Sequence, residues 1–408
     1  MAITHSFKLL LTCAMILQLT ACGKSSKVIP APLPLITPPV VVNYQDVIDD
    51  LISTEIPGII LLVETPQTRF IGSAGVSNLQ TQQAMQVGDI IPTASVGKKM
   101  IALLAAQLAD EGQLNLDDTL DTWLSESILS RIANSHQMTF RQLLNHTSGV
   151  FNYDEIDDGD AYIDLLLDAP EVLKTDIDFI ELIFDHPGYF LPGEGYQYSN
   201  SGYSLAGLIM DEVLGEHHSV AMRNRFFDPL GMTATYYKGS EALVGDFISG
   251  YLTTDDGDVI DTRPMLINTS QADSPVVSSV EDMATFLKAL ITDNSFANET
   301  VKNTLFGADN LITQGANEKS GLGIDIVTVD GHRVYAHAGL TFGYMAQNVY
   351  IEDTNTSIVL LFNCGNGGVN TCSTTFDGLI RIVDPRSGNT IADCSGHLEN
   401  ILDFALSK

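Results

Sequence analysis

Ser95 and Lys98 stand three residues apart in SVGKKMIALLAAQLADEG (95–112), a largely apolar segment that is predicted to form a helix. Side chains at this spacing lie on one face of a helical turn, about 5–6 Å apart. Burial and the positive end of the helix dipole both lower the pKa of a lysine, and a neutral amine can take the proton of a serine hydroxyl. We therefore expect Ser95 to be a nucleophile with Lys98 as its base. The free backbone N–H of Ser95 is expected to stabilise an oxyanion.

The charges at the two ends of this predicted helix oppose its dipole. Lys98 and Lys99 fall in the first turn, and Asp110 and Glu111 fall in the last. This placement makes sense if a lysine is needed in its neutral form. Lys99 is rotated by about 100° from Lys98, and its side chain is expected to reach solvent.

Two later segments contain polar residues that could complete such a site. YSN (198–200) lies between a turn-rich loop and the start of a predicted helix, and HAG (337–339) lies at the end of a predicted strand. An S-x-x-K spacing on its own arises by chance about once in a chain of this size. The prediction therefore depends on the three segments together.

The ordered set S-x-x-K, Y-x-N and [K/H]-x-G resembles the penicillin-binding protein and serine β-lactamase superfamily. The closer resemblance is to the branch that contains class C β-lactamases, D-alanyl-D-alanine carboxypeptidases, D-aminopeptidases and related esterases. It covers residues 43 to 365, about four fifths of the chain. Four further phrases agree with it: LLNHTSGV (143–150), LPGEGYQYSNSGYSLAG (191–207), DPLGMTAT (228–235) and SSVEDMATF (278–286).

The resemblance implies a role for each motif residue beside Ser95 and Lys98. Tyr198 is expected to pass a proton to the leaving group, and Asn200 to bond Lys98 or the substrate amide. His337 is expected to line the cleft from its strand. Gly339 would let a substrate approach the strand backbone, and the N–H of Leu340 would be the second oxyanion donor. His146, in NHTSG, is read as a structural loop residue.

The third motif departs from the pattern of carboxypeptidases and many β-lactamases. Their middle residue is Thr or Ser, whose hydroxyl binds a substrate carboxylate, whereas this chain has Ala338. His337 carries only part of a charge at neutral pH, unlike lysine. We expect Ala338 to face the cleft and the carboxylate anchor to be weak. Esters, or amides without a carboxylate at that subsite, are therefore the expected substrates.

Hydrophobic periodicity predicts an α/β fold. Two strands near the N-terminal end and four near the C-terminal end would form one antiparallel sheet built from both chain ends and flanked by helices, with a mainly helical region (about 114–275) inserted. The expected strands are 58–65, 69–76, 322–329, 333–339, 344–352 and 357–363. The expected helices include 140–150, 162–173, 202–215 and 278–291.

The chain has 408 residues, 45% of them hydrophobic, and a formal net charge of -31. This charge excludes a nucleic-acid partner, because binding phosphates needs a basic face. The acidic clusters DEIDDGD (154–160) and TDDGDV (254–259) do not complete a calcium-binding loop. They are predicted to be solvated loops.

The N-terminal segment is predicted to be a bacterial lipoprotein signal (1–22). A short apolar run precedes LTAC (19–22), which resembles a lipobox whose Cys22 carries the lipid. Residues 23–42 contain five prolines and are predicted to be a semi-extended tether. The hydrolase domain is expected from residue 43 to 408. The predicted location is the cell envelope, anchored to the periplasmic face of the outer membrane.

Export places the chain in an oxidising compartment. Once Cys13 leaves with the signal and Cys22 carries lipid, three cysteines remain: Cys364, Cys372 and Cys394. An odd number allows at most one disulfide. The sequence leaves open which of them pair.

Together these features predict an envelope-anchored serine hydrolase that forms an acyl-enzyme with ester or amide substrates and uses no metal or cofactor. Its partners would be small molecules or peptides, including cell-wall fragments, and the bacterial membrane through the lipid anchor. An esterase-like or D-amino-acid amidase or peptidase role competes with D-alanyl-D-alanine carboxypeptidase or β-lactamase action. The alternative from another class is a non-catalytic protein that binds peptidoglycan or β-lactams, which the presence of Ser95, Lys98 and Tyr198 disfavours.

Two other hydrolase classes do not fit the sequence. A zinc peptidase would show H-E-x-x-H, which is absent, and GEHHSV (215–220) has no evident third ligand. An α/β-hydrolase would show G-x-S-x-G, but Thr93 occupies the first glycine position before Ser95.

Overall fold

The computed structural model describes residues 43–53, 56–253, 258–329 and 331–365. The predicted signal (1–22), the tether (23–42) and the cysteines beyond residue 365 lie outside these residues. Cys364 is disulfide-bonded. No helix within the described ranges has the length and apolar character needed to cross a bilayer.

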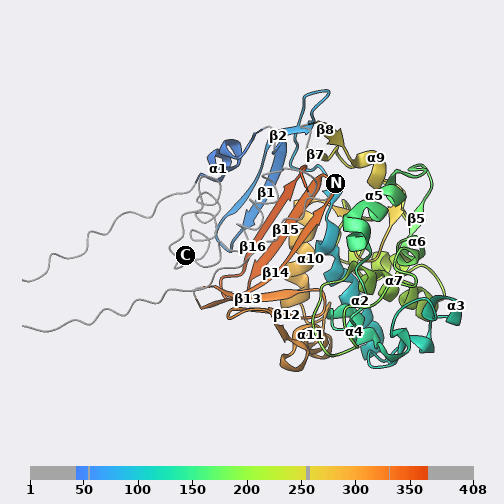
Figure 1. The fold of residues 1–408 in the computed structure, drawn as a ribbon. Coiled ribbons are helices and arrows are strands. Elements are labelled where there is room, and N and C mark those ends of the chain that lie inside the picture. The colour runs from blue at the N-terminus through green and yellow to red at the C-terminus, as the bar shows by residue number, and fades with distance from the viewer. Residues whose placement is uncertain (1–42, 54–55, 254–257, 330, 366–408) are drawn as a thin grey trace, which may run out of the picture. The chain divides into compact units, whose positions relative to one another are not determined.

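A large antiparallel sheet organises the described part of the chain, in the strand order β11-β12-β13-β14-β15-β16-β1-β2-β3 (Figure 1). Residues from the two ends of this part meet where β1 pairs antiparallel with β16. The predicted sheet built from both chain ends is thereby confirmed. Its strands are β1 (Gly58–Glu64), β2 (Arg69–Asn78), β3 (Gln83–Ala84), β11 (Ile312–Thr313), β12 (Glu318–Ser320), β13 (Asp325–Val329), β14 (His332–Thr341), β15 (Tyr344–Ile351) and β16 (Thr356–Phe362).

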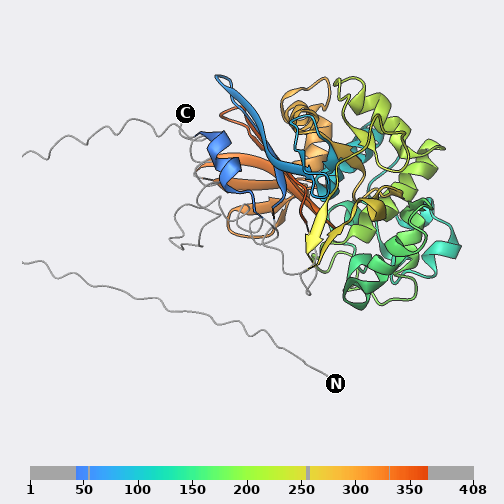
Figure 2. The same ribbon diagram turned by 90° about the horizontal axis from the view of Figure 1, so that it is seen from above.

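Alternating side chains bury both faces of this sheet. In β1, Ile60 and Leu62 pack into the larger core, whereas Ile59, Leu61 and Val63 pack into a second core on the other face. Helix α1 (Tyr44–Asp50) covers the second face, and the remaining helices lie on the opposite side (Figure 2). The run GIILLVE is apolar at every position except its last because neither face meets water.

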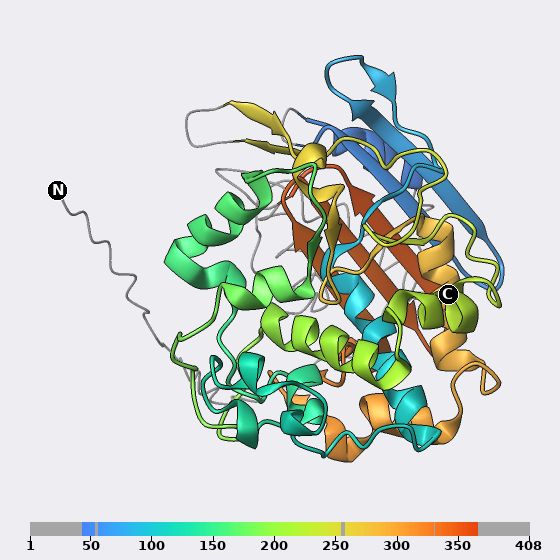
Figure 3. The ribbon, with the colours of Figure 1, turned by 90° about the vertical axis from the view of Figure 1, so that its right-hand side faces the viewer.

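The helical region packs in front of the sheet, as Figure 3 shows. The predicted helices at 140–150, 162–173, 202–215 and 278–291 are present; the first two are shorter than predicted, and the last two are shifted by one or two residues. The helices are α2 (Lys98–Asp110), α3 (Glu126–Leu129), α4 (Phe140–Leu144), α5 (Asp160–Leu167), α6 (Asp176–Glu181), α7 (Asn200–Leu214), α8 (His218–Met222), α9 (Arg263–Leu266), α10 (Val280–Thr292) and α11 (Glu299–Phe306). Short strands lie between these helices. One sheet of three contains β4 (Ile91–Pro92), β10 (Val276–Ser278) and β6 (Tyr236–Tyr237), and two pairs contain β5 (Lys174–Thr175) with β9 (Thr269–Ser270) and β7 (Tyr251–Thr253) with β8 (Val259–Asp261).

The segment that contains Ser95 does not begin as an α-helix. A 3₁₀ turn, η1 (Ala94–Gly97), precedes α2, which starts at Lys98. The tighter turn is followed by an α-helix whose residues Met100 to Ala106 are all buried. Ser95 is therefore held at the buried N-terminal end of α2 rather than within it.

Candidate active site

Ser95 is the second residue of the η1 turn, between β4 and α2. The residue before it, Ala94, has φ 49°, a left-handed conformation that is strained for alanine, and it is almost fully buried. Strand β14 lies directly against this turn, because a Cβ added to Gly339 would collide with the carbonyl oxygen of Thr93. Only glycine permits this approach of the strand backbone to the serine turn.

Lys98 is completely buried beneath Ser95. Its Nζ lies 3.0 Å from Ser95 Oγ and donates to Asn200 Oδ1 and to the carbonyl oxygen of Asp273, both at 2.7 Å. Burial lowers the pKa of Lys98 to about 8, although the nearby carboxylates of Asp273 and Asp154 act in the opposite direction. A substantial fraction of Lys98 is thus a neutral amine near pH 8, in contact with the serine hydroxyl.

Tyr198 lies beside Lys98, with its ring centroid 5.2 Å from Lys98 Nζ. Burial raises its pKa well above the ordinary value, and a hydrogen bond with Ser95 opposes this rise only in part. Tyr198 is therefore a phenol at neutral pH, not a phenolate. It can donate a proton, and it cannot act as the resident base.

His146 fixes the position of Tyr198. Their ring centroids are 4.2 Å apart with an interplanar angle of 32°, and His146 Nδ1 accepts from the backbone N–H of Ser199 at 3.2 Å. Burial and the charge of Lys98 hold the pKa of His146 well below its ordinary value, so the ring is neutral. The sequence predicted only a structural loop role for His146. Its backbone has φ 61°, a left-handed conformation that is common at functional sites and that the sequence does not reveal.

Asn200 is the first residue of α7 and does not cap the helix, because Ser199 occupies the N-cap position. Its amide links two charged groups instead. Oδ1 accepts from Lys98, and Nδ2 donates to Asp154 Oδ2 at 2.8 Å. The backbone N–H of Asn200 donates to Asn152 Oδ1 at 2.9 Å, which holds this end of the helix in place.

His337 is buried on β14, and its Nδ1 donates to the carbonyl oxygen of Ala338 at 2.6 Å. Burial, reinforced by Lys99 and Lys98, lowers the pKa of His337 to about 3. The third motif therefore presents a neutral imidazole at pH 7. The expectation of a partial charge at this position is corrected.

The expectation that Ala338 faces the cleft is corrected in part. Residues alternate between the two faces of β14, so His337 and Gly339 lie on the face toward the serine turn. Ala338 reaches the rim of a recess beside Ser95, but its side chain packs against the core on the opposite face of the sheet. The side chain of Leu340 packs on the face of the sheet that Ala338 contacts. Leu340 also lines both recesses beside Ser95.

Two recesses meet at Ser95, with volumes of about 280 and 560 Å³. Both are lined by Ser95, Asp154, Asn200 and Leu340. Tyr198 and His337 line only the larger one. Among the described residues, neither lining includes lysine or arginine, so every residue that can carry a full charge there at pH 7 is acidic: Asp154 and Asp273 in the smaller recess, and Asp154, Glu318 and Asp325 in the larger.

Known proteins resemble this chain in sequence and in fold. The Beta-lactamase family model matches residues 44–375, which is most of the chain. The chain belongs to the β-lactamase family. It is a serine hydrolase of the β-lactamase and DD-peptidase type, and its sheet and flanking helices have the fold of that family.

Relatives of this β-lactamase-family protein differ in their named activities. Penicillin-binding protein 4* of Bacillus subtilis is 24% identical over 320 residues, which cover 75% of this chain and 68% of that protein. Lovastatin esterase of Penicillium rubens is 28% identical over 169 residues, covering 38% of this chain and 41% of the esterase. A D-stereospecific amidohydrolase from Streptomyces sp. has a solved structure with a TM-score of 0.69 and 24% identity, covering 79% of this chain and 93% of the amidohydrolase.

Lys99 of this β-lactamase-family protein does not reach solvent, contrary to the sequence-based expectation. It is 1% exposed, and its Nζ has no hydrogen-bond partner within the part of the chain that the structure describes. The side chain is enclosed because α2 packs against the sheet, where Asp325 of β13 is its electrostatic partner. Burial lowers the pKa of Lys99 to about 7.

Lys99→Met is expected to weaken the pH dependence of stability above pH 7. An unfolded lysine titrates near 10.5, so between pH 7 and 9 the unfolded state binds more protons than the folded state, and the free energy of unfolding rises with pH. Removing Lys99 removes its share of this rise. Urea denaturation at pH 7, 8 and 9 measures the effect; equal slopes in wild type and variant would contradict it. Buried Lys98 and Lys238, whose pKa values are lowered to about 8, maintain a residual slope.

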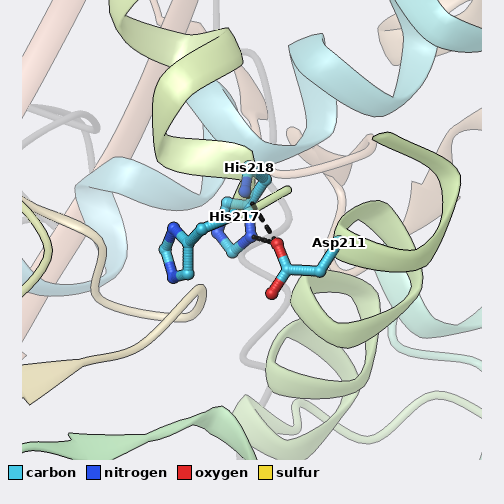
Figure 4. Close-up of side chains that lie close together, drawn as sticks. All are labelled: Asp211, His217 and His218. Carbon is cyan, nitrogen blue, oxygen red and sulfur yellow. Dashed lines mark hydrogen bonds and ion pairs between the residues drawn. The ribbon is translucent and has the colours of Figure 1, made fainter. Parts of the chain in front are cut away.

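His217 and His218 have a third neighbour that is not evident from the sequence. Asp211, near the end of α7, has a carboxylate oxygen close to both imidazoles (Figure 4). Asp211 Oδ1 lies 2.7 Å from both the backbone N and Nδ1 of His218, and His218 Nε2 lies 2.6 Å from the hydroxyl of Tyr237. His217 bonds serines instead: its Nδ1 lies 2.8 Å from Ser219 Oγ, and its Nε2 lies 3.4 Å from the hydroxyls of Ser240 and Ser270. None of these residues lines either recess at Ser95. The group therefore joins α7 and α8 to β6.

Two acids beside Lys98 were also missed. Asp154 was assigned to a solvated loop, yet it lines both recesses and bonds Asn200. Asp273 showed no signal in the sequence, because its proximity to Lys98 depends on a contact between α2 and the loop before β10. The cluster TDDGDV lies largely outside the described residues.

Proposed function

We propose that Ser95 attacks ester or amide substrates and carries the acyl group, with an esterase-like or D-amino-acid amidase or peptidase role. The observation that carries this proposal is the fully buried Lys98, whose Nζ lies 3.0 Å from Ser95 Oγ and whose pKa is lowered to about 8. A neutral amine in this position can accept the serine proton as the Oγ–carbon bond forms.

The later steps use the two oxyanion donors expected from the motifs, and Tyr198, which interacts with both Ser95 and Lys98. The backbone N–H groups of Ser95 and Leu340 stabilise the oxyanion of the tetrahedral intermediate. As the carbonyl–leaving-group bond breaks, Tyr198 gives its proton to the departing oxygen or nitrogen and regains one from Lys98. Water then attacks the acyl-enzyme by the same route in reverse, and releases the acid and free Ser95.

The absence of an anion anchor in the described lining favours substrates without a carboxylate next to the leaving group. His337 is neutral, Ala338 has no hydroxyl, and the charged lining residues are acids. A charged hydrogen bond to a carboxylate is worth about 1.5–3 kcal/mol, or roughly 10- to 100-fold in affinity. Penicillins and D-alanyl-D-alanine peptides lose this contribution, whereas simple esters do not require it.

Intact-protein mass spectrometry tests the reaction and its substrate class together. The protein is mixed with p-nitrophenyl esters, D-alanyl-D-alanine peptides and penicillin, and both the covalent adduct and kcat/KM are measured. Faster turnover of esters supports the proposal. Efficient cleavage of the peptides or penicillin would mean that another residue holds the carboxylate, and a stable adduct without turnover would favour a binding protein.

We extend the proposal to attachment at the cell envelope, on the basis of the apolar N-terminal run and LTAC (19–22). Cys22→Ser is expected to release the protein from membrane pellets or to block its processing, because the cysteine thiol is the lipid acceptor. Fractionation of cells that express wild type and variant measures this. A wild type found entirely in the soluble fraction would contradict the anchor.

A further inference from the structure

The smaller recess at Ser95 contains two carboxylate oxygens that have no hydrogen-bond partner among the described residues. Asp273 is 4% exposed. Its Oδ2 lies 3.8 Å from Lys98 Nζ, and its Oδ1 has no hydrogen-bond partner. Asp154 uses Oδ2 to accept from Asn200, and its Oδ1 has no partner either. The buried Ser274 hydroxyl in the same lining is also unpartnered. Buried acceptors without donors are costly, so this arrangement suits a ligand that donates hydrogen bonds.

The charge of this recess selects the kind of donor. When Lys98 is in its neutral, reactive form, Asp154 loses the one cation that acts on it among the described residues, and the negative charge of Asp273 adds to the cost of ionising Asp154. Asp273 keeps an electrostatic interaction with the buried Lys238. A carboxylate ligand would be repelled. An ammonium group supplies both the missing positive charge and the missing N–H donors.

Aromatic rings form another part of this lining and suit an amino-acid-sized group. The rings of Tyr162 on α5 and Phe342, just after β14, have centroids 5.4 Å apart and both line the recess. Their faces can accommodate a cation or an aliphatic or aromatic side chain. A volume of about 280 Å³ has room for one such residue.

The position of Tyr198 decides which part of the substrate enters this recess. Tyr198, the proposed proton donor to the leaving group, lines only the larger recess. The leaving group therefore occupies the larger recess, and the acyl part occupies the smaller one.

We propose that Asp154 and Asp273 bind the ammonium group of the acyl part, so that the preferred substrates are esters or amides of acids with a free amino group. This inference rests on the proposed function, since it requires Ser95 to be acylated. The substrate class is that of unblocked amino-acid esters and amides, including an N-terminal residue of a short peptide.

Matched substrates test the inference directly. The methyl esters and p-nitroanilides of D- and L-phenylalanine are compared with their N-acetyl derivatives and with the corresponding 3-phenylpropionyl compounds, which lack the amino group. The free amines should give kcat/KM values about 10- to 100-fold higher than the other two series, as expected for one charged hydrogen-bonded contact. Equal or lower values for the free amines would overturn the inference.

Asp273→Asn and Asp154→Asn should each reduce the ratio of free-amine to N-acetyl kcat/KM by about tenfold. The N-acetyl rate in the same variant corrects for any change at Lys98. Asp157→Asn is the matched control, because it removes an exposed acid from the same η4 segment (Tyr153–Gly159) and should leave the ratio unchanged. An unchanged ratio in both recess variants would overturn the inference.

Inhibition of the wild-type protein tests the same site without any variant that could misfold. Benzylammonium should inhibit hydrolysis of the N-acetyl ester competitively, whereas benzyl alcohol at the same concentration should not. Equal inhibition by both would reject the cation site. If no substrate is cleaved and Ser95 carries no adduct, the proposed function itself fails. If the N-acetyl ester is cleaved without any preference for amines, only the assignment of the recess fails.

Discussion

Ser95→Ala is expected to abolish turnover, with a loss on the order of 10⁶-fold in kcat, and to abolish labelling by serine-directed phosphonates. The reason is that Ser95 Oγ is the only hydroxyl among the described residues for which a hydrogen bond to Lys98 Nζ is resolved. Loss of one oxygen from a partly exposed position should leave the fold intact. Labelling is followed by intact mass, and folding by circular dichroism.

Ser204→Ala is the matched control for this variant. Ser204 is a buried serine on α7 that lines neither recess. It should keep both turnover and labelling. Phosphonate incorporation into Ser95→Ala at the wild-type level would show that the nucleophile is another residue.

The relation between Ser95 and Lys98 could be predicted from the sequence because it is local. Three residues of helical backbone bring the two side chains together whatever surrounds them. The predicted strands could be recognised for a similar reason, since runs such as GIILLVE (58–64) have the composition of strands buried on both faces. The sequence did not show that Ser95 belongs to a 3₁₀ turn, because α and 3₁₀ turns share the same residue preferences at a helix start.

The features that the sequence did not predict depend on contacts between segments that are distant in the chain. Lys99 is enclosed by β13, and its partner Asp325 is far away in the chain. The side chain of Ala338 faces away from the serine turn because of the pleat of β14, and strand phase is set by the register with β15. Asp154 was read as part of a charged loop, and one residue of such a loop can turn inward when a buried amide, here Asn200, meets it.

These tertiary contacts change the electrostatics of the site more than its list of residues. The motif residues alone suggest a cleft with a weak cation at His337. The structure shows instead a neutral imidazole and a set of carboxylates around the serine. The preference for or against charged substrates therefore comes from residues outside the motifs.

Lys98→Met is expected to reduce kcat/KM by about 10²- to 10⁴-fold, the contribution of a positioned general base. Methionine fills a similar volume, but it leaves Asn200 Oδ1 and the carbonyl of Asp273 without their donor, at a cost of roughly 1–3 kcal/mol in stability. Lys99→Met is the matched control, since it removes the adjacent buried lysine and should keep activity within a few fold. Comparable losses in both variants would indicate a structural effect and not loss of a base.

The pH profile identifies the base without deleting it. Only the neutral amine of Lys98 can accept the serine proton, so kcat/KM for an uncharged ester should rise with pH through an apparent pKa near 8. At pH 6 the rate should be about a hundredth of its plateau. Asp273 raises the pKa of Lys98, so in Asp273→Asn the rise should move to lower pH because that carboxylate charge is gone. A profile that is flat between pH 6 and 9, or that moves to higher pH in this variant, would exclude Lys98 as the base.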